Sequence, residues 1–330
     1  MSTTTTKIVF TLCSNNYLAH AFALGHSVKQ QARDVRFVIG LVDRKDAAIN
    51  YDQYPEFEIL PYDLLGVSWF EDMLGRYNVI EFNTAVKPFY IDYFFRKAEG
   101  HCSVLYIDPD ILFYQSPQVL FDLLESHSIV VTPNLTEVGT AIAPGELASL
   151  RHGMFNLGFI GVRDTPESRR FVEWWMHRLH THCKIDKGRG VFVDQKWVDL
   201  APLYFSGFHI SYHKGFNMAW WNVSERNFLK EGSTYYVNDK TTPLVFFHFS
   251  GYKPGSVYFT GRNNDAKENS FDAHPELKEL FEDYVERLRA NGFDQLSKLK
   301  PLLPFAHAVP KQKSGYHSLI RKGIKRLLKG

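Results

Sequence analysis

The opening residues alternate between apolar runs and a helical pattern, and this alternation restricts the possible folds more than any other feature of the chain. Lys7–Cys13 and Val35–Val42 are apolar runs of strand length, and residues 15–29 between them predict a helix. Such a strand-helix-strand unit pairs its strands in parallel and gathers its loops at their carboxyl ends. No G-x-G-x-x-G turn follows the first strand, which disfavours a dinucleotide-binding oxidoreductase. We therefore expect an α/β fold with ligands bound at the carboxyl ends of its strands.

The alternation of strands and helices continues along the chain. Further strands are expected at 57–61, 103–107, 129–131, 155–162, 203–205, 209–211 and 244–249, and helices at 69–77, 88–97, 117–125, 166–182, 275–288 and 319–328. Residues 134–154 are rich in Gly, Pro and Thr and weakly periodic, so we expect a loop or a mobile flap there. With no repeat and no linker before about Pro301, the sequence predicts a single domain at 1–300, with a Rossmann-like mixed sheet flanked by helices, and a helical basic tail at 301–330.

Charge is distributed unevenly between the body of the chain and this tail. Residues 311–330 carry seven Lys or Arg residues and no Asp or Glu, so the net charge of +2 becomes −5 for residues 1–310. The body therefore lacks a broadly basic surface, and we expect no nucleic-acid partner. In the tail, apolar residues fall on one helical face, namely Ile320, Ile324, Leu327 and Leu328. This pattern suits binding to an anionic membrane surface, with a solvated or frayed end as the alternative because Gly323 weakens a helix.

The three cysteines bear on the compartment of the protein. Cys13, Cys102 and Cys183 are too few and too scattered for a disulfide framework or a zinc site. The start of the sequence lacks the pattern of a signal peptide, and no apolar run reaches the length that spans a bilayer. These features predict a cytoplasmic protein, which the tail could hold at the inner face of the cell membrane.

The most informative motif is Asp108-Pro109-Asp110, directly after the apolar run 103–107. In an extended segment, residues two apart point the same way, so Asp108 and Asp110 can address one cation. Pro109 donates no ladder hydrogen bond, which places the triplet at the end of a strand. The triplet therefore predicts a cation site, with a solvated turn as the alternative.

A second motif follows the apolar run 244–249. His248 stands at the end of that run, and Gly251 and Lys253 come shortly after it. Glycine lets the backbone approach an anion, and lysine supplies a positive charge. Carboxylate oxygens together with one imidazole suit Mn²⁺ or Mg²⁺, so we expect Asp108, Asp110 and His248 to bind the same ion.

Four other candidates are weaker when they are taken one at a time. Asn156 and Gly158 lie in a predicted strand, where a glycine commonly marks close packing of the backbone. Asp194 and Gln195 precede a predicted helix through Leu200, and capping that helix would explain them equally well.

Taken together, these residues resemble the GT-A glycosyltransferases, and most closely the retaining enzymes of glycosyltransferase family 8, in an ordered set of motifs from Lys7 to Pro254. The resemblance implies eight donor-binding positions, which are Thr11, Asn15, Lys87, Asp108, Asn156, Gly158, Gly251 and Lys253. It implies metal ligation by Asp108, Asp110 and His248. It places Asp194 and Gln195 beside the reacting carbon.

The resemblance also implies a reaction. A hexose-type sugar would pass from a nucleotide-diphosphate sugar, with UDP-sugars favoured, to a saccharide or lipid-linked saccharide, with Mn²⁺ or Mg²⁺ as cofactor. Anomeric configuration would be retained; without the resemblance, Asp194 could serve as the general base of an inverting enzyme. The chain departs from the family pattern at Cys13, where an acidic residue is common, at the bulky Leu157, and in a loop one residue shorter before Lys253.

Two other classes of protein share part of this pattern. Phosphatases of the haloacid dehalogenase type also place an Asp-x-Asp motif after an apolar strand, but near the N-terminus rather than a third of the way along the chain. A non-catalytic carbohydrate-binding protein would account for the 15% aromatic residues. It would not account for a metal triad next to a lysine.

Overall fold

The computed structural model describes residues 5–138, 144–261 and 267–306, and it confirms the α/β class. The strands are β1 (Thr6–Cys13), β2 (Arg36–Leu41), β3 (Glu58–Pro61), β4 (Cys102–Ile107), β5 (Ile111–Phe113), β6 (Ile129–Pro133), β7 (Phe155–Arg163), β8 (Ile185–Asp186), β9 (Val191–Phe192), β10 (Phe208–Ile210), β11 (Met218–Ala219), β12 (Phe228–Glu231), β13 (Thr234–Val237), β14 (Asp239–Pro243) and β15 (Phe246–His248). The helices are α1 (Leu18–Gln31), α2 (Phe70–Arg76), α3 (Val79–Ala85), α4 (Lys87–Lys97), α5 (Gln118–Ser126), α6 (Pro144–His152), α7 (Pro166–His182), α8 (Gln195–Val198), α9 (Ala201–Tyr204), α10 (Lys278–Ala290) and α11 (Phe293–Leu296).

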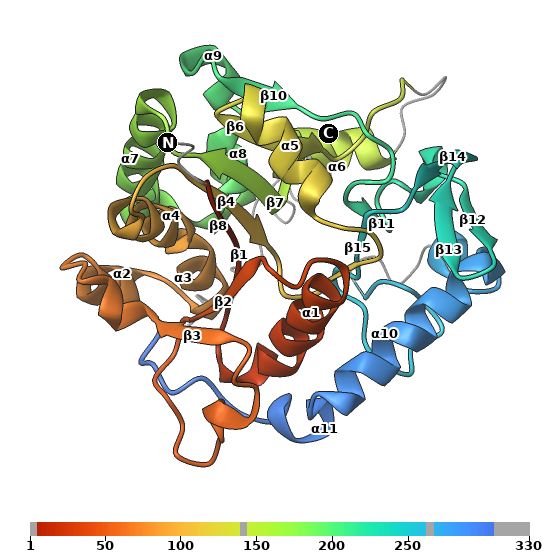
Figure 1. The fold of residues 1–330 in the computed structure, drawn as a ribbon, viewed down its shortest axis with the longest axis horizontal. Coiled ribbons are helices and arrows are strands. Elements are labelled where there is room, and N and C mark those ends of the chain that lie inside the picture. Colours follow the sequence, from red (N-terminus) through yellow and green to blue (C-terminus); the bar gives the residue numbers. More distant parts are fainter. Residues whose placement is uncertain (1–4, 139–143, 262–266, 307–330) are drawn as a thin grey trace, which may run out of the picture.

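A seven-stranded mixed sheet in the order β10-β6-β7-β4-β1-β2-β3 forms the centre of the molecule (Figure 1). Strands β4, β1, β2 and β3 are parallel neighbours, whereas β7 runs antiparallel to both β4 and β6. The chain moves outward from β1 to β3 and then returns to add β4 on the other side of β1. Open α/β sheets bind ligands at such a reversal of strand order, beyond the carboxyl ends of the strands. The sheet therefore favours a site beyond the ends of β1 and β4.

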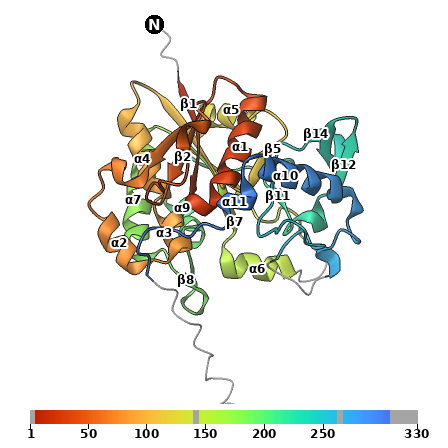
Figure 2. The same ribbon diagram turned by 90° about the horizontal axis from the view of Figure 1, so that it is seen from below.

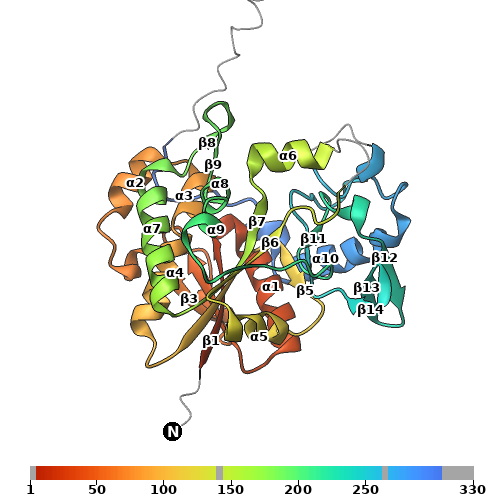
Figure 3. The same ribbon diagram turned by 90° about the horizontal axis from the view of Figure 1, so that it is seen from above.

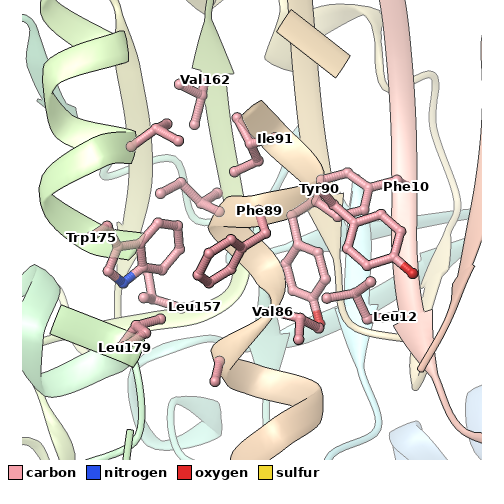
Figure 4. Packing of buried hydrophobic residues seen from close by; sticks show 14 of the residues in the cluster. Phe10, Leu12, Val86, Phe89, Tyr90, Ile91, Leu157, Val162, Trp175 and Leu179 are labelled. Atoms are coloured by element: carbon pink, nitrogen blue, oxygen red, sulfur yellow. The ribbon is translucent and has the colours of Figure 1, made fainter. Parts of the chain in front are cut away.

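Helices cover both faces of the sheet, with α4 and α7 on one face and α1 and α5 on the other (Figure 3). Side chains of β1 alternate between the two layers, as a strand buried on both faces requires. Phe10 and Leu12 pack with Tyr90 of α4 and Trp175 of α7 on the first face (Figure 4). Val9 and Cys13 pack into the cluster on the second face. The aromatic residues of α7 thus serve mainly to fill the core.

A smaller unit adjoins the large sheet on the side of α1, where α10 covers the sheets β11-β15-β5 and β12-β13-β14 (Figures 1 and 2). Its core is aromatic: the ring of Phe249 stacks on Tyr284 of α10 with centroids 3.9 Å apart, and Phe281 packs edge-on to Phe249. Phe249 follows β15 directly. This packing therefore holds the end of β15, where His248 stands, against the rest of the molecule.

Two of the predicted elements are wrong. Residues 134–154 were expected to lack regular structure, but α6 occupies Pro144–His152. A strand was expected at 203–205, but Ala201–Tyr204 forms the short helix α9, which leaves the Leu203 side chain 76% exposed. The helix expected at 319–328 lies outside the described residues. Among the described helices, none is both long and apolar enough to cross a membrane.

Residues 301–306 pack against the body of the molecule. The backbone N–H groups of Leu302 and Leu303 donate to Oδ1 of Asp43 at 2.9 and 3.2 Å, and the Leu303 side chain is buried. The N–H of Ala306 donates to the carbonyl of Tyr77 at 3.0 Å. The segment after Lys300 is thus attached to the body just beyond the carboxyl end of β2.

Candidate functional site

Asp108-Pro109-Asp110 connects β4 of the large sheet to β5 of the small sheet. The N–H of Asp108 donates to the carbonyl of Gly158 in β7 at 2.7 Å, and the carbonyl of Asp110 accepts from the N–H of Phe249 at 2.9 Å. Both sheets therefore fix the backbone of the triplet. As expected from the sequence, the triplet lies beyond the carboxyl end of β4, at the reversal of strand order.

His248 completes a three-residue group with Asp108 and Asp110. Strand β15 pairs antiparallel with β5, with His248 opposite Ile111, and this register brings the imidazole to the triplet. Nε2 of His248 lies 3.0 Å from Oδ1 of Asp110 and 3.7 Å from Oδ2 of Asp108. One ligand atom from each of the three residues lies within 4.8 Å of the others.

The donor set of this group fits a divalent cation. Two carboxylates and one imidazole are ligands that Mn²⁺ and Mg²⁺ accept in proteins. Asp108 and Asp110 are half-buried, whereas His248 is 3% exposed. Two carboxylates held this close repel each other, and a cation between them would remove that repulsion.

Gly158 packs directly against the ring of His248. A Cβ atom added to Gly158 would lie 2.5 Å from Cε1 of His248, a distance that real side chains do not tolerate. The imidazole also contacts Trp221, whose ring meets it edge-on with centroids 5.2 Å apart. The glycine thus has a structural reason to be present, because only a bare α-carbon leaves room for the imidazole.

Lys87 and Asp194 form a buried ion pair beside the triplet. Nζ of Lys87 lies 2.6 Å from Oδ2 of Asp194 and donates to the carbonyl of Leu157 at 2.9 Å. Burial raises the pKa of the Asp194 carboxyl, and the ammonium group of Lys87 opposes that rise. Asp194 stands at the N-cap position of α8, but its side chain makes no capping hydrogen bond. Capping therefore does not explain Asp194.

Tyr106 connects this ion pair to the triplet. Its ring lies under Nζ of Lys87, 4.1 Å from the centroid, and its hydroxyl donates to Oδ1 of Asp108 at 2.6 Å. Burial, followed by the charge of Asp108, raises the pKa of Tyr106 well above its ordinary value, so the phenol stays protonated and remains a donor. The sequence offered a signal for this residue, since Tyr106 is two positions before Asp108 and shares its face of the strand.

Gln195 joins the ion pair to β7. Its Oε1 accepts from the N–H of Leu157 at 3.4 Å, and its Nε2 donates to the carbonyl of His152 in α6 at 3.3 Å. The first residues of β7 are therefore held on one side by Lys87 and Gln195.

Thr11 and Asn15, two of the expected donor-binding residues, are buried at the end of β1. Nδ2 of Asn15 donates to Asp43 at 3.2 Å and to the carbonyl of Arg44 at 2.8 Å, while its Oδ1 accepts from the hydroxyl of Tyr51 at 2.7 Å. Oγ1 of Thr11 is buried and has no hydrogen-bond partner in the described part of the chain. Cys13 is buried in the core, and the carboxylate that contacts Asn15 is that of Asp43.

Gly251 and Lys253 lie in the loop after β15. Gly251 adopts a φ of 74°, in the left-handed region that glycine enters without strain. Its carbonyl accepts from the N–H of Gly261 at 2.8 Å, which closes the loop. The side chain of Lys253 is exposed. The structure thus leaves this lysine free to meet an anion near the end of β15.

Comparisons with known proteins agree with this architecture. No protein-family model matches the sequence. The uncharacterized protein YfnF of Bacillus subtilis (strain 168) is 25% identical over 291 residues, which make up 86% of this chain and 92% of YfnF. The apo structure of the bifunctional glycosyltransferase WbbM superposes with a TM-score of 0.50 at 14% identity, over 87% of this chain and 50% of that one. The chain has the fold of a GT-A glycosyltransferase.

A further solved structure is similar to the chain over almost all of its length. The galactosyltransferase LgtC, in complex with donor and acceptor sugar analogues, matches with a TM-score of 0.49 at 14% identity, over 93% of this chain and 99% of LgtC. Within the GT-A fold of the present chain, the triplet and His248 occupy the boundary between the large and small sheets.

Asn217 has a place in the site that the sequence did not indicate. Its side chain is 1% exposed and contacts Thr132, Asn156 and His248. Two of these partners are 61 and 31 residues away in the sequence, and no motif surrounds Asn217. Only the fold shows the connection.

Proposed function

We propose that the chain is a metal-dependent glycosyltransferase. It transfers a hexose-type sugar from a nucleotide-diphosphate sugar, with UDP-sugars favoured, to a saccharide or lipid-linked saccharide acceptor. The observation that carries this proposal is the group of Asp108, Asp110 and His248 beyond the end of β4, in a chain with the GT-A fold. In this proposal the three side chains hold Mn²⁺ or Mg²⁺.

The bound cation would act as a Lewis acid that neutralises charge on the diphosphate. Lys253 supplies a second positive charge to that group from the loop after β15, where its side chain is exposed. Gly251 allows the backbone of the same loop to approach the phosphates. Thr11 and Asn15 lie at the carboxyl end of β1 and just beyond it, and in this proposal they belong to the part of the site that receives the nucleoside.

The sugar lies between the diphosphate and the start of β7 in this proposal. Asn156 and Gly158 line it from β7, and Asp194 and Gln195 flank the anomeric carbon. The bond from that carbon to the diphosphate oxygen breaks, and a bond to the acceptor oxygen forms on the same face of the sugar. The acceptor proton passes to the departing phosphate. Because Asp194 is already paired with Lys87, the pair is suited to position the sugar and stabilise charge rather than to accept the proton.

The location of the protein is part of the same proposal. A cytoplasmic enzyme with seven basic residues in 311–330 would bind anionic lipid at the inner face of the cell membrane, close to lipid-linked acceptors. Vesicles that contain anionic lipid should sediment the full chain but not a chain without residues 311–330. Equal sedimentation of the two would remove the tail from this role.

The proposed function is tested by release of nucleoside diphosphate from a panel of nucleotide sugars, measured with Mn²⁺ and with chelator. Wild type is compared with Asp110→Asn and with Asp34→Asn, whose carboxylate is exposed in the turn before β2. We expect Mn²⁺-dependent release from one donor, lost in Asp110→Asn and kept in Asp34→Asn. Release that persists in chelator would contradict the role of the metal. Binding of a saccharide without any release or nucleotide-sugar binding would indicate a carbohydrate-binding protein instead.

A further inference from the structure

Asn217 is held beside His248 by the small sheet. It directly precedes β11, and β11 pairs with β15 so that Ala219 lies opposite His248. The backbone of Asn217 has a φ of 53°, a left-handed conformation that asparagine adopts more readily than most residues. Its carbonyl accepts from Nδ2 of Asn222 at 3.1 Å. The position of the Asn217 amide is thus determined independently of any ligand.

The direction of the hydrogen bonds around this amide follows from backbone groups. The N–H of Gly158 can only donate, and it lies 3.0 Å from Asn156, so the atom of Asn156 facing it is the acceptor Oδ1. The Asn217 atom that lies 3.2 Å from this oxygen and 3.4 Å from the carbonyl of Asn156 faces two acceptors. It must therefore be the donor Nδ2. The other N–H of the same group reaches Oγ1 of Thr132 at 2.9 Å.

Oδ1 of Asn217 is consequently turned toward His248, 3.3 Å from Nδ1. Because an amide oxygen only accepts, Nδ1 of the imidazole must carry the proton. A neutral imidazole protonated at Nδ1 has its lone pair on Nε2, and Nε2 is the atom that faces Asp110 and Asp108. Nε2 is then a ligand atom directed at the cation site.

We infer that Asn217 is the positioning residue of the metal site: it sets the tautomer and the orientation of His248, and Asn156 and Gly158 fix its own orientation. The inference rests on the proposed function only in the identity of the ion. Partners of this kind behind a metal-binding histidine affect affinity by about 10- to 100-fold.

The same hydrogen bonds determine how Asn156 meets a substrate. Its Oδ1 is occupied by Gly158 and Asn217, whereas its Nδ2 has no partner among the described residues. Asn156 therefore presents only a donor to the site, and the sugar must offer an acceptor oxygen there. One chain of hydrogen bonds thus sets both the metal ligand and the polarity of the sugar contact.

The experiment measures binding of Mn²⁺ alone, without nucleotide, from the electron paramagnetic resonance signal of the free ion. Asn217→Gly keeps the left-handed backbone and removes the amide, and Asn238→Gly makes the same change at an exposed left-handed asparagine away from the site. We expect Asn217→Gly to weaken Mn²⁺ binding about 10- to 100-fold and Asn238→Gly to bind as wild type does. Equal affinity of wild type and Asn217→Gly, or an equal loss in Asn238→Gly, would overturn the inference.

A second measurement observes the imidazole of His248 in wild type, so it does not depend on the folding of an Asn217 variant. In wild type with ¹⁵N-labelled histidine and Mg²⁺, the signal of His248, assigned by its loss in His248→Gln, should show Nδ1 protonated and Nε2 unprotonated. A proton on Nε2 would overturn the inference. If wild type binds Mn²⁺ but releases no nucleoside diphosphate, the proposed function fails and Asn217 keeps its role. If wild type binds no Mn²⁺, the proposed metal site and this inference fail together.

Discussion

Nζ of Lys87 lies 2.6 Å from Oδ2 of Asp194, and both residues are 2% exposed. Two elements far apart in the sequence thereby meet, since Lys87 begins α4 and Asp194 precedes α8. The ammonium group also contacts the carbonyl of Leu157 and the rings of Tyr106 and Trp175. Removing either charge would leave the other buried without its partner.

The first prediction concerns this ion pair. Lys87→Met should lower the free energy of unfolding by about 3–5 kcal/mol, because it leaves an uncompensated carboxylate in the interior. The double variant Lys87→Met/Asp194→Asn should be more stable than Lys87→Met alone. Urea unfolding of the variants measures these differences.

A surface pair provides the matched control. Arg96 and Asp92 form an exposed i,i+4 pair on α4, and Arg96→Met should cost less than about 1 kcal/mol. A cost for Lys87→Met as small as that of Arg96→Met would show that Asp194 reaches solvent or another cation.

The second prediction concerns the close packing of Gly158 and His248. In Gly158→Ala the new Cβ would lie 2.5 Å from Cε1 of His248, so the imidazole must leave the position in which its Nε2 faces Asp110. We expect Mn²⁺ affinity to fall by about tenfold or more, and the overpacking to cost about 1–3 kcal/mol of stability. Calorimetric titration with Mn²⁺ tests this directly.

Gly161→Ala is the control for that variant, because it lies in the same strand. Its Cβ would meet the ends of the Leu105 and Leu124 side chains at 3.1 and 3.3 Å, and these can shift slightly. Mn²⁺ affinity should be unchanged in Gly161→Ala. A similar loss in both variants would indicate a general disturbance of β7 rather than displacement of His248.

Strands of the large sheet could be predicted from the sequence because both faces of the sheet are buried. Ile8–Cys13 and Val104–Ile107 are therefore uninterrupted by charge. Strands β5 and β11 are buried but were missed, because they are only three and two residues long. Other elements that were missed lie at the surface. Strand β12 has one buried residue followed by three exposed ones, and α6 leaves Leu147 and Leu150 52% and 72% exposed, so neither produces a clear apolar period.

The candidate site, like the fold, could be predicted from the sequence only in part. Asp108 and Asp110 could be paired from the sequence because residues two apart at a strand end share a direction. Asn15 could be placed at the end of the first strand, but the contacts of its amide with Asp43 and Tyr51 could not be predicted, because neither partner is near it in the sequence. Contacts made across the fold, such as those of Asn217, have no local pattern to reveal them.

The third prediction concerns the contacts of residues 301–306. Asp43 accepts hydrogen bonds from Leu302 and Leu303, and burial raises the pKa of its carboxyl while these bonds oppose the rise. A chain that ends at residue 300 should be less stable than one that ends at residue 306 by about 3 kcal/mol, from the lost hydrogen bonds to a charge and the lost burial of Leu303. Equal unfolding free energies would place the end of the folded domain at residue 300.

The fourth prediction concerns pH and His20. This imidazole is packed between the ring of Tyr17, with centroids 4.5 Å apart, and the edge of Phe293, and its Nδ1 has no hydrogen-bond partner among the described residues. Burial lowers the pKa of His20 from 6.5 to about 4, and the charge of Asp110 opposes this shift. The folded state thus binds the proton less readily than the unfolded chain.

The sign of the effect follows from this difference. The neutral form of His20 contributes to the free energy of unfolding. This contribution is fully present above pH 6.5 and is lost as the pH falls from 6.5 toward 4. Between pH 7 and pH 5 the loss should be about 2 kcal/mol, from 1.36 kcal/mol per unit of pKa. Over the same pH range, the unfolding free energy of His20→Phe should fall by about 2 kcal/mol less than that of wild type. Urea unfolding in the presence of chelator measures this difference. The exposed His101→Gln should behave as wild type, and an unchanged pH dependence in His20→Phe would show that His20 is not the group responsible.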